Sequence, residues 1–113
     1  MKYSIYQIVL TGEDCDEINS MENPHENHPK FRAHRLTMDG KFNEGFGFYN
    51  KVAEIEANDL EHVFEISNLG REDAITRLDR MHSLSVGDIV IDGNNIQWGV
   101  EDIGFAELEN IIL

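Results

Sequence analysis

Residues 89–100 read IVIDGNNIQWGV, and this stretch decides the fold class. An Asp-Gly pair between two apolar, β-branched runs is a strong signal for a tight turn that joins antiparallel strands. Trp98 lies in the second run, and we expect its side chain in the core because a single tryptophan on a hairpin is more often buried than exposed. The stretch therefore predicts a β-hairpin with its loop at residues 92–95, and Gly104 is expected to end the β region.

The residues that lead into this hairpin, SLSVGD at 83–88, have the composition of a rigid turn. Gly87 tolerates the positive φ that such a turn requires, and the Asp88 carboxylate can accept hydrogen bonds from turn amides. The hydroxyl groups of Ser83 and Ser85 can bond neighbouring backbone groups in the same way. Turn chemistry thus explains each residue type at its position, although the same residues also suit a contact surface.

Further strands are expected on both sides of this region. Residues 3–10, YSIYQIVL, are apolar on both faces, which predicts a central strand. Residues 49–56 alternate, which predicts an edge or half-buried strand with Ala53 and Val52 on opposite faces. The strand at 96–100 is expected to offer an exposed edge at which a second copy of the chain can pair, so a homo-oligomer is one expectation.

Short helices are expected between these strands. Residues 13–19 place acids in the first turn, where the helix dipole favours them, and residues 30–38 predict a second short helix. The best-defined helix has Asn58 as its predicted N-cap and Glu61 as the capping-box partner three residues later. Asn68 or Gly70 can supply a left-handed C-cap.

The remaining segments are expected to be irregular. Residues 20–29 hold both prolines and predict a surface loop, residues 71–78 a short turn, and residues 106–113 a short apolar tail. No repeat or linker divides the chain, so residues 1–113 are expected to form one domain. The sequence predicts an α+β fold, with an antiparallel sheet of four to six strands and two or three short helices.

Length and composition bound the class of protein. The chain has 113 residues, of which 41% are hydrophobic and 27% charged, close to the average for globular domains. It contains neither an apolar run long enough to span a membrane nor the pattern of a secretory signal. The single Cys15 cannot form an internal disulfide, and we therefore expect a cytoplasmic protein.

The charge balance is the strongest global observation. Asp and Glu total 22 and Lys and Arg total 9, which gives a formal net charge of −13. Nucleic-acid phosphates and anionic membranes repel such a chain, so we expect no direct nucleic-acid binding and no membrane partner. A protein partner remains as the expectation, and the charge also serves solubility.

One polar patch stands out in the acidic second half of the chain. After Lys51 the only basic side chains of Lys or Arg type are Arg71, Arg77 and Arg80. Their guanidinium groups can hold an acidic or phosphate-bearing ligand, or they can pair with the acids beside them. The residues predicted to form a binding surface are Arg77, Arg80, His82, Ser83, Ser85, Asp88 and Trp98.

A family resemblance rests on three strings in this half. They are RMHSLSVGDIV at 80–90, the GF pair at 104–105, and NDLEHVF at 58–64 followed by Asn68. Together they resemble small proteins of phages and mobile elements, with the YodL-like domain as a relative. The resemblance reaches the N-terminus only through the strand YSIYQ at 3–7. It implies a phage or mobile-element accessory protein, and it brings no catalytic activity or cofactor with it.

Signals for catalysis or metal binding are sparse. The sequence lacks a P-loop, a nucleophile elbow and a dinucleotide fingerprint, so we expect no catalytic residues and no cofactor. His25 and His28 have the spacing of two zinc ligands, but prolines bracket them and no CxxC partner exists, which favours a solvated loop. A small enzyme or metal-binding protein is therefore the third hypothesis.

The main hypothesis is a non-enzymatic protein that binds a host-encoded protein and inhibits or regulates a host process. The second is an acidic DNA mimic that blocks a nucleic-acid-binding protein, because the chain after Asp88 contains acids and no Lys or Arg. The predicted mimic surface consists of Asp92, Glu101, Asp102, Glu107 and Glu109.

Overall fold

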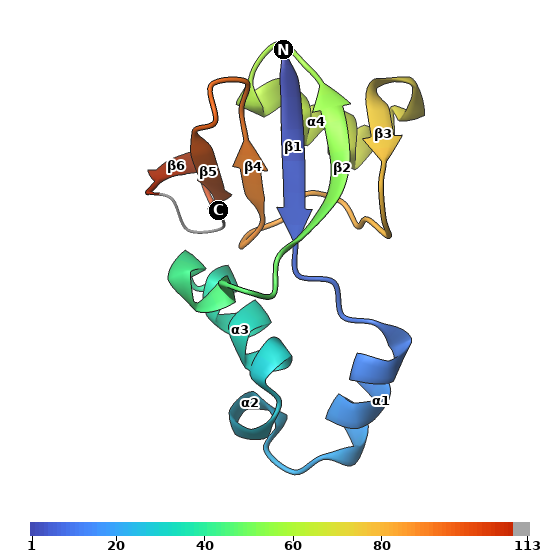
Figure 1. Cartoon of the computed structure of the whole chain (residues 1–113), viewed down its shortest axis with the longest axis vertical. Coiled ribbons are helices and arrows are strands. Elements are labelled where there is room, and N and C mark those ends of the chain that lie inside the picture. Colours follow the sequence, from blue (N-terminus) through green and yellow to red (C-terminus); the bar gives the residue numbers. More distant parts are fainter. Residues whose placement is uncertain (110–113) are drawn as a thin grey trace.

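The computed structural model describes residues 1–109. Six strands form one sheet in the order β3-β2-β1-β4-β5-β6, and every pair of neighbours is antiparallel (Figure 1). The predicted α+β fold with an antiparallel sheet is confirmed. The strands are β1 (Lys2–Gln7), β2 (Asn50–Glu56), β3 (Ile75–Arg77), β4 (Ile89–Ile91), β5 (Gln97–Val100) and β6 (Phe105–Leu108). The α-helices are α1 (Gly12–Ser20), α2 (Pro24–Asn27), α3 (Pro29–Met38) and α4 (Leu60–Leu69), with 3₁₀ turns η1 (Phe42–Gly45) and η2 (Glu72–Ala74).

Strand β1 is central, as its two apolar faces predict. It pairs with β2 along one edge and with β4 along the other. Ile5 in its middle is fully buried. Burying one such side chain contributes roughly 1.5–3 kcal/mol to the stability of the fold.

The two faces of the sheet carry separate apolar clusters. One cluster joins Ile5 and Val90 to Val63 on α4, and α4 lies across this face (Figure 1). The other cluster joins Ile89 to Phe42 of η1. The alternation of side chains along each strand divides the sheet in this way.

Strand β2 contains an irregularity that the alternating pattern did not predict. Ile5 pairs with Ala53 while Tyr6 pairs with Lys51, so Val52 is the extra residue of a β-bulge. The bulge brings Val52 and Ala53 into the same core cluster, and the prediction of opposite faces is wrong. Strand β2 also lies between β1 and β3, so it is not an edge strand.

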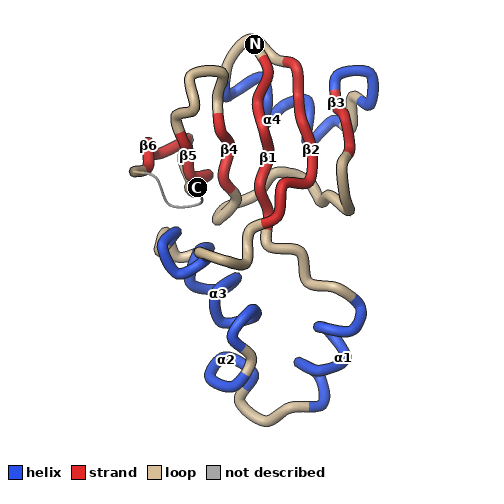
Figure 2. The backbone as a smooth tube through the Cα atoms, in the orientation of Figure 1, coloured by secondary structure: helices blue, strands red, loops and turns tan. Residues whose placement is uncertain are grey.

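The connection between β1 and β2 forms a helical lobe beyond the end of the sheet, built from α1, α2 and α3 (Figures 1 and 2). The Thr11 hydroxyl caps α1 by accepting from the Asp14 amide. Helix α2 lies inside the predicted loop at 20–29. Its first residue, Pro24, fits there because the first turn of a helix does not use that N–H group.

Helix α4 begins one residue later than the sequence predicts. The Asp59 carboxylate, not the Asn58 side chain, accepts from the His62 amide at 2.8 Å. The backbone N–H of Asn58 donates to His62 Nδ1 instead. Of the two predicted C-cap residues, Gly70 ends the helix, with φ of 68°. None of the helices within residues 1–109 combines the length and the apolar character that a membrane crossing needs.

The hairpin is confirmed, but two strands were not predicted. Strand β3 follows a 3₁₀ turn where the sequence indicated only a short turn. Gly104, with φ of 78°, turns the chain back into β6, which pairs with β5 along residues 97–100. The predicted exposed edge at 96–100 is therefore wrong, and β3 and β6 form the edges of the described sheet. The rest of the expected tail, residues 110–113, lies outside the described residues.

Candidate functional site

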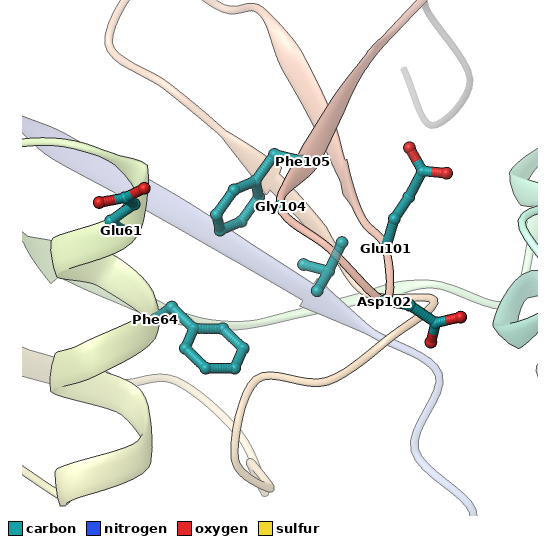
Figure 3. Close-up of a pocket in the computed structure, with 7 residues that line it drawn as sticks. Glu61, Phe64, Glu101, Asp102, Gly104 and Phe105 are labelled. Carbon is teal, nitrogen blue, oxygen red and sulfur yellow. The ribbon is translucent and has the colours of Figure 1, made fainter.

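A groove runs along the α4 face of the sheet, between α4 and the turn that joins β5 to β6 (Figure 3). Its inner part has a volume of about 250 Å³, and it adjoins a wider hollow of about 540 Å³ that shares three of its lining residues. We call the two together the α4–β6 groove. Its lining residues are Met1, Tyr3, Asp59, Leu60, Glu61, Phe64, Asp92, Trp98, Val100, Glu101, Asp102, Gly104 and Phe105.

Aromatic side chains form the walls of this groove. Phe64 is 42% exposed, whereas Val63 beside it on α4 is fully buried, so the helix presents Phe64 at the margin of its apolar face. Phe105 pairs with Val100 in register and is half-buried. Figure 3 shows the two rings on opposite sides of the groove. An apolar surface of this kind in contact with water marks a candidate interaction site.

Trp98 lies in this groove and not wholly in the core. Its side chain packs against the core cluster but stays half-buried. The indole N–H donates to Asp92 Oδ2 at 3.0 Å, so its polar end has a partner. One flank of the Trp98 ring is thus available to the open part of the groove.

The rim of the groove is acidic. Glu61, Glu101 and Asp102 line the groove and are exposed, and Figure 3 shows Glu101 and Asp102 on the side opposite Glu61, with their carboxylates pointing away from the two rings. Among the lining residues named above there is no Lys, Arg or His, and the N-terminal ammonium group of Met1 is paired with Glu56 at 3.0 Å. Such a rim favours a cationic partner and disfavours an anionic one.

The predicted binding residues do not form one surface. Arg77 on β3 makes a two-pronged ion pair with Glu72, at 2.6 and 3.0 Å. Arg80 and Ser83 are exposed on the segment between β3 and β4, whereas Asp88 is 5% exposed. Trp98 lies in the α4–β6 groove.

Asp88 belongs to a buried polar network that sequence reasoning only half predicted. Its Oδ2 accepts from the Ser85 amide at 2.9 Å, which is the predicted turn contact, and from Gln7 Nε2 at 3.0 Å. Burial raises the pKa of Asp88 to about 6. Gly87 has φ of 96°, as the turn chemistry predicts. The motif at 83–88 thus has a structural role.

Gln7 is the member of this network that sequence reasoning missed. It donates to the His82 carbonyl at 2.9 Å and accepts from the His82 amide at 3.2 Å. A glutamine inside an otherwise apolar central strand is itself a signal, because a buried amide needs hydrogen-bond partners. Through these hydrogen bonds of Gln7, β1 holds in place the segment that leads into β4.

A second pocket lies where the helical lobe meets this segment. It has a volume of about 350 Å³ and adjoins a smaller hollow of about 60 Å³ above Asp88. We call it the His34 pocket, since His34 on α3 lines both parts. The larger part is lined by Ile8, Val9, Leu10, His34, Arg80, Met81 and His82. The sequence singled out Arg80 and His82 here, but it did not predict His34.

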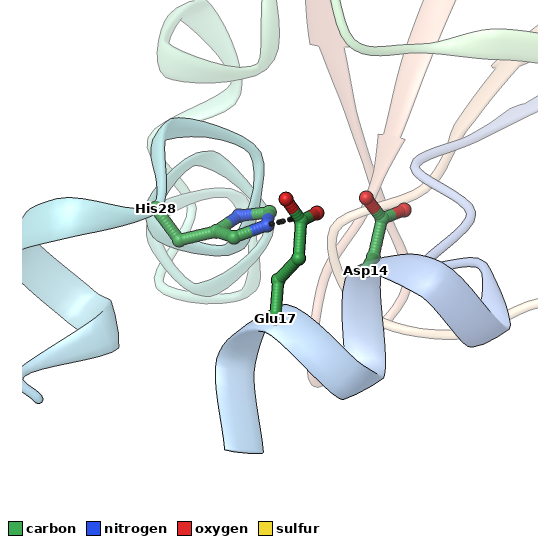
Figure 4. A group of neighbouring side chains, drawn as sticks. All are labelled: Asp14, Glu17 and His28. Carbon is green, nitrogen blue, oxygen red and sulfur yellow. Dashed lines mark ion pairs between the residues drawn. The ribbon is translucent and has the colours of Figure 1, made fainter. Parts of the chain in front are cut away.

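The predicted histidine pair does not form a metal site. His25 stacks on Phe31, with 5.2 Å between ring centroids, while His28 faces Glu17 at 3.5 Å and lies near Asp14 (Figure 4). Nδ1 of His28 accepts from the Phe31 amide, so the neutral ring carries its proton on Nε2, the atom that faces the carboxylates. A metal needs a lone pair at that atom.

The ammonium group of Lys30 already pairs with one carboxylate of this cluster. Lys30 Nζ lies 2.7 Å from Asp14 Oδ2. The hydrogen bond from Lys30 lowers the pKa of Asp14 to about 2. The cluster therefore ties α1 to α3 and does not present three vacant ligands.

The five predicted mimic acids have different roles. Asp92 holds the hairpin loop, because its Oδ1 accepts from the amides of Asn94 and Ile96. Glu101 and Asp102 belong to the groove rim. Glu107 and Glu109 are exposed on and after β6.

Comparisons with protein-family models, curated proteins and solved structures found no match to this chain. The resemblance to the YodL-like domain stays a prediction.

Proposed function

We propose that this protein acts by binding a protein partner, and that the partner inserts an apolar side chain flanked by Lys or Arg into the α4–β6 groove. The observation that carries the proposal is an aromatic pair, the exposed Phe64 and the half-buried Phe105, within an acidic rim. Neither feature alone selects a partner. Together they select a basic segment with an apolar anchor.

The apolar walls supply the affinity in this proposal. Phe64, Phe105 and the free flank of Trp98 can bury one or two side chains of a partner. Each fully buried Leu or Phe side chain contributes roughly 1.5–3 kcal/mol. Aromatic side chains in such pockets are the residues on which binding energy concentrates.

The acidic rim supplies selectivity and speed of association. Glu61 on α4 and Glu101 and Asp102 after β5 flank the walls on two sides. Attraction by this rim accelerates encounter with a basic segment and falls as salt screens it, with a Debye length of about 10 Å at 0.1 M. Binding is therefore expected to weaken with salt without disappearing, because the apolar contact remains.

A direct test uses three synthetic peptides, RKLFRK, RKSSRK and EELFEE, titrated into the ¹⁵N-labelled protein. We expect RKLFRK to shift the amide signals of α4 and of the β5–β6 turn. The other two peptides should bind at least about tenfold more weakly, a difference of about 1.4 kcal/mol. Equal binding of RKLFRK and RKSSRK, or no binding of either, would contradict the groove.

A matched pair of variants locates the contact. Phe64→Ser removes a groove wall, and Leu69→Ser removes an apolar side chain that is 67% exposed on the same helix but outside the groove. We expect the first variant to lose RKLFRK binding and the second to retain it. If both retain it and binding vanishes at high salt, charge alone is responsible, as the DNA-mimic alternative requires.

A further inference from the structure

The His34 pocket gathers basic side chains in a chain that is acidic overall. Three side chains with basic nitrogen atoms, Arg80, His34 and His82, line a hollow in a chain whose net charge is −13. Its other walls are apolar and come from Ile8 to Leu10, just after β1, and from Met81. The pocket thus has a cationic side and an apolar side.

Of the three arginines after Lys51, Arg80 is the one available to a ligand. Arg77 pairs with Glu72 and Arg71 lies 3.5 Å from Asp73, so both are engaged on the surface. Within residues 1–109 the Arg80 guanidinium makes no ion pair, although its backbone amide contacts Asp79. An unpaired guanidinium presents a planar set of donors that matches a carboxylate or phosphate group.

His34 adds a second, independent observation. Its Nδ1 is buried and has no hydrogen-bond partner in the described part of the chain. Leaving a buried polar atom without a partner costs roughly 1–3 kcal/mol. His34 lines both parts of the pocket, so this unpaired nitrogen belongs to a residue of the pocket wall.

No acid lines the larger part of the pocket, in which the anion is placed. Asp88 lines only the smaller hollow, where its Oδ2 accepts from Gln7 and from the Ser85 amide. His82 Nδ1 lies 2.8 Å from the Ser83 carbonyl oxygen, which only accepts, so Nδ1 carries a proton. Nε2 can therefore donate to an oxyanion when the ring is in its imidazolium form, which has a proton on both nitrogens. Arg35 neighbours His34 on α3 and adds positive charge near it.

We propose that the His34 pocket binds a small organic oxyanion, with the carboxylate or phosphate group at Arg80 and His82 and an apolar body against Ile8, Leu10 and Met81. The volume of about 350 Å³ lies at the lower end of the range of ligand pockets, roughly 300–1,000 Å³, so the ligand is small. This site is separate from the α4–β6 groove and shares no lining residue with it.

The test titrates the ¹⁵N-labelled protein with phenyl phosphate, benzoate, inorganic phosphate and benzyl alcohol. We expect saturable shifts of the amides of residues 8–10 and 80–82 with phenyl phosphate or benzoate, and the tighter of the two identifies the anionic group. Benzyl alcohol lacks the charge and inorganic phosphate lacks the apolar body, so each should bind at least about tenfold more weakly. Equal binding of benzyl alcohol, or no saturable binding of either aromatic anion, overturns the proposal.

Two arginine variants provide the control. Arg80→Gln should weaken binding of the preferred anion at least about tenfold, whereas Arg77→Gln should leave it unchanged. Both side chains are exposed, so neither replacement removes a core contact. Equal affinity of the two variants overturns the role of Arg80. Phe64→Ser should leave anion binding unchanged, so the outcome for the His34 pocket does not depend on whether the α4–β6 groove binds a peptide.

Discussion

Asp88 shows how one buried carboxylate can make stability depend on pH. It is 5% exposed, and two donors, Gln7 and the Ser85 amide, satisfy its Oδ2. Desolvation outweighs these hydrogen bonds and raises its pKa from 3.8 to about 6. The protonated form therefore fits the fold better than the charged form does.

Replacing Asp88 by Asn should remove this pH dependence. In the native protein the proton on Asp88 stabilises the fold fully below about pH 4, and this stabilisation is lost as pH rises through about 6. The difference in unfolding free energy between the protein and Asp88→Asn should change by up to about 3 kcal/mol across this window. Urea denaturation of both proteins at several pH values measures it, and parallel curves would refute the shifted pKa.

For single residues, the predictions from sequence were correct where contacts between near neighbours determine the conformation. The positive φ of Gly87 and the contact from the Ser85 amide to Asp88 follow from turn chemistry between near neighbours. The role of Gln7 could not be predicted in the same way. Its partners His82 and Asp88 are 75 and 81 positions away, and their proximity is set by the sheet.

Helix α4 illustrates how a start signal can be misplaced by one residue. Asn58 and Asp59 are both good N-cap residues, and the sequence alone favoured Asn58 because Glu61 follows three positions later. In the structure, Asp59 accepts from the His62 amide. Which of these two residues caps the helix depends on the position at which the chain leaves β2. The local sequence pattern does not specify that position.

Alanine substitution distinguishes the two cap assignments. Asp59→Ala should lower the free energy of unfolding by about 1 kcal/mol, because it leaves an amide of the first turn without its acceptor. Asn58→Ala should have a clearly smaller effect, since only its backbone N–H contacts the helix. Thermal unfolding of the two variants compares them directly, and a larger loss in Asn58→Ala would restore the sequence-based assignment.

The missed strands share a physical cause. β3 and β6 have three and four residues, and neither carries the alternating pattern of a half-buried strand. They form because their neighbours, β2 and β5, offer unpaired backbone groups. Strands of this kind depend on tertiary context, whereas β1 and the β4–β5 hairpin have their own sequence signals.

The molecule combines a well-packed sheet with a helical lobe whose first helix, α1, is weakly packed. Helix α1 has no buried residue, and its ties to the rest of the lobe include the Asp14–Lys30 pair and the Glu17–His28 contact. By contrast, Ile5 and Ile55 in the central strands are fully buried. Local opening is therefore expected to be much easier in α1 than in the sheet.

Hydrogen exchange should reveal this division. Amides of α1 should exchange faster than those of β1, and Lys30→Ala should accelerate α1 further, by a factor of about five for a loss of about 1 kcal/mol. Lys41→Ala, which removes an exposed lysine without an ion pair in the described chain, is the matched control. Equal protection of α1 in both variants would show that the Asp14–Lys30 pair does not hold the lobe.

Neither candidate site could be assembled from the sequence. The α4–β6 groove combines Phe64 with Phe105, and the His34 pocket combines α3 with the residues after β1 and those before β4. The sequence did mark individual members, including Arg80, His82, Trp98 and Glu101. It did not indicate which would become neighbours, because that depends on the order of strands in the sheet.

The central position of β1 has a consequence for synthesis on the ribosome. β1 leaves the exit tunnel well before its second neighbour, β4, is made, because β2, β3 and helices α1 to α4 lie between them in the chain. Until β4 emerges, one side of this aromatic, β-branched strand lacks its partner. Folding is therefore expected to be slow, and the nascent chain is expected to bind chaperones.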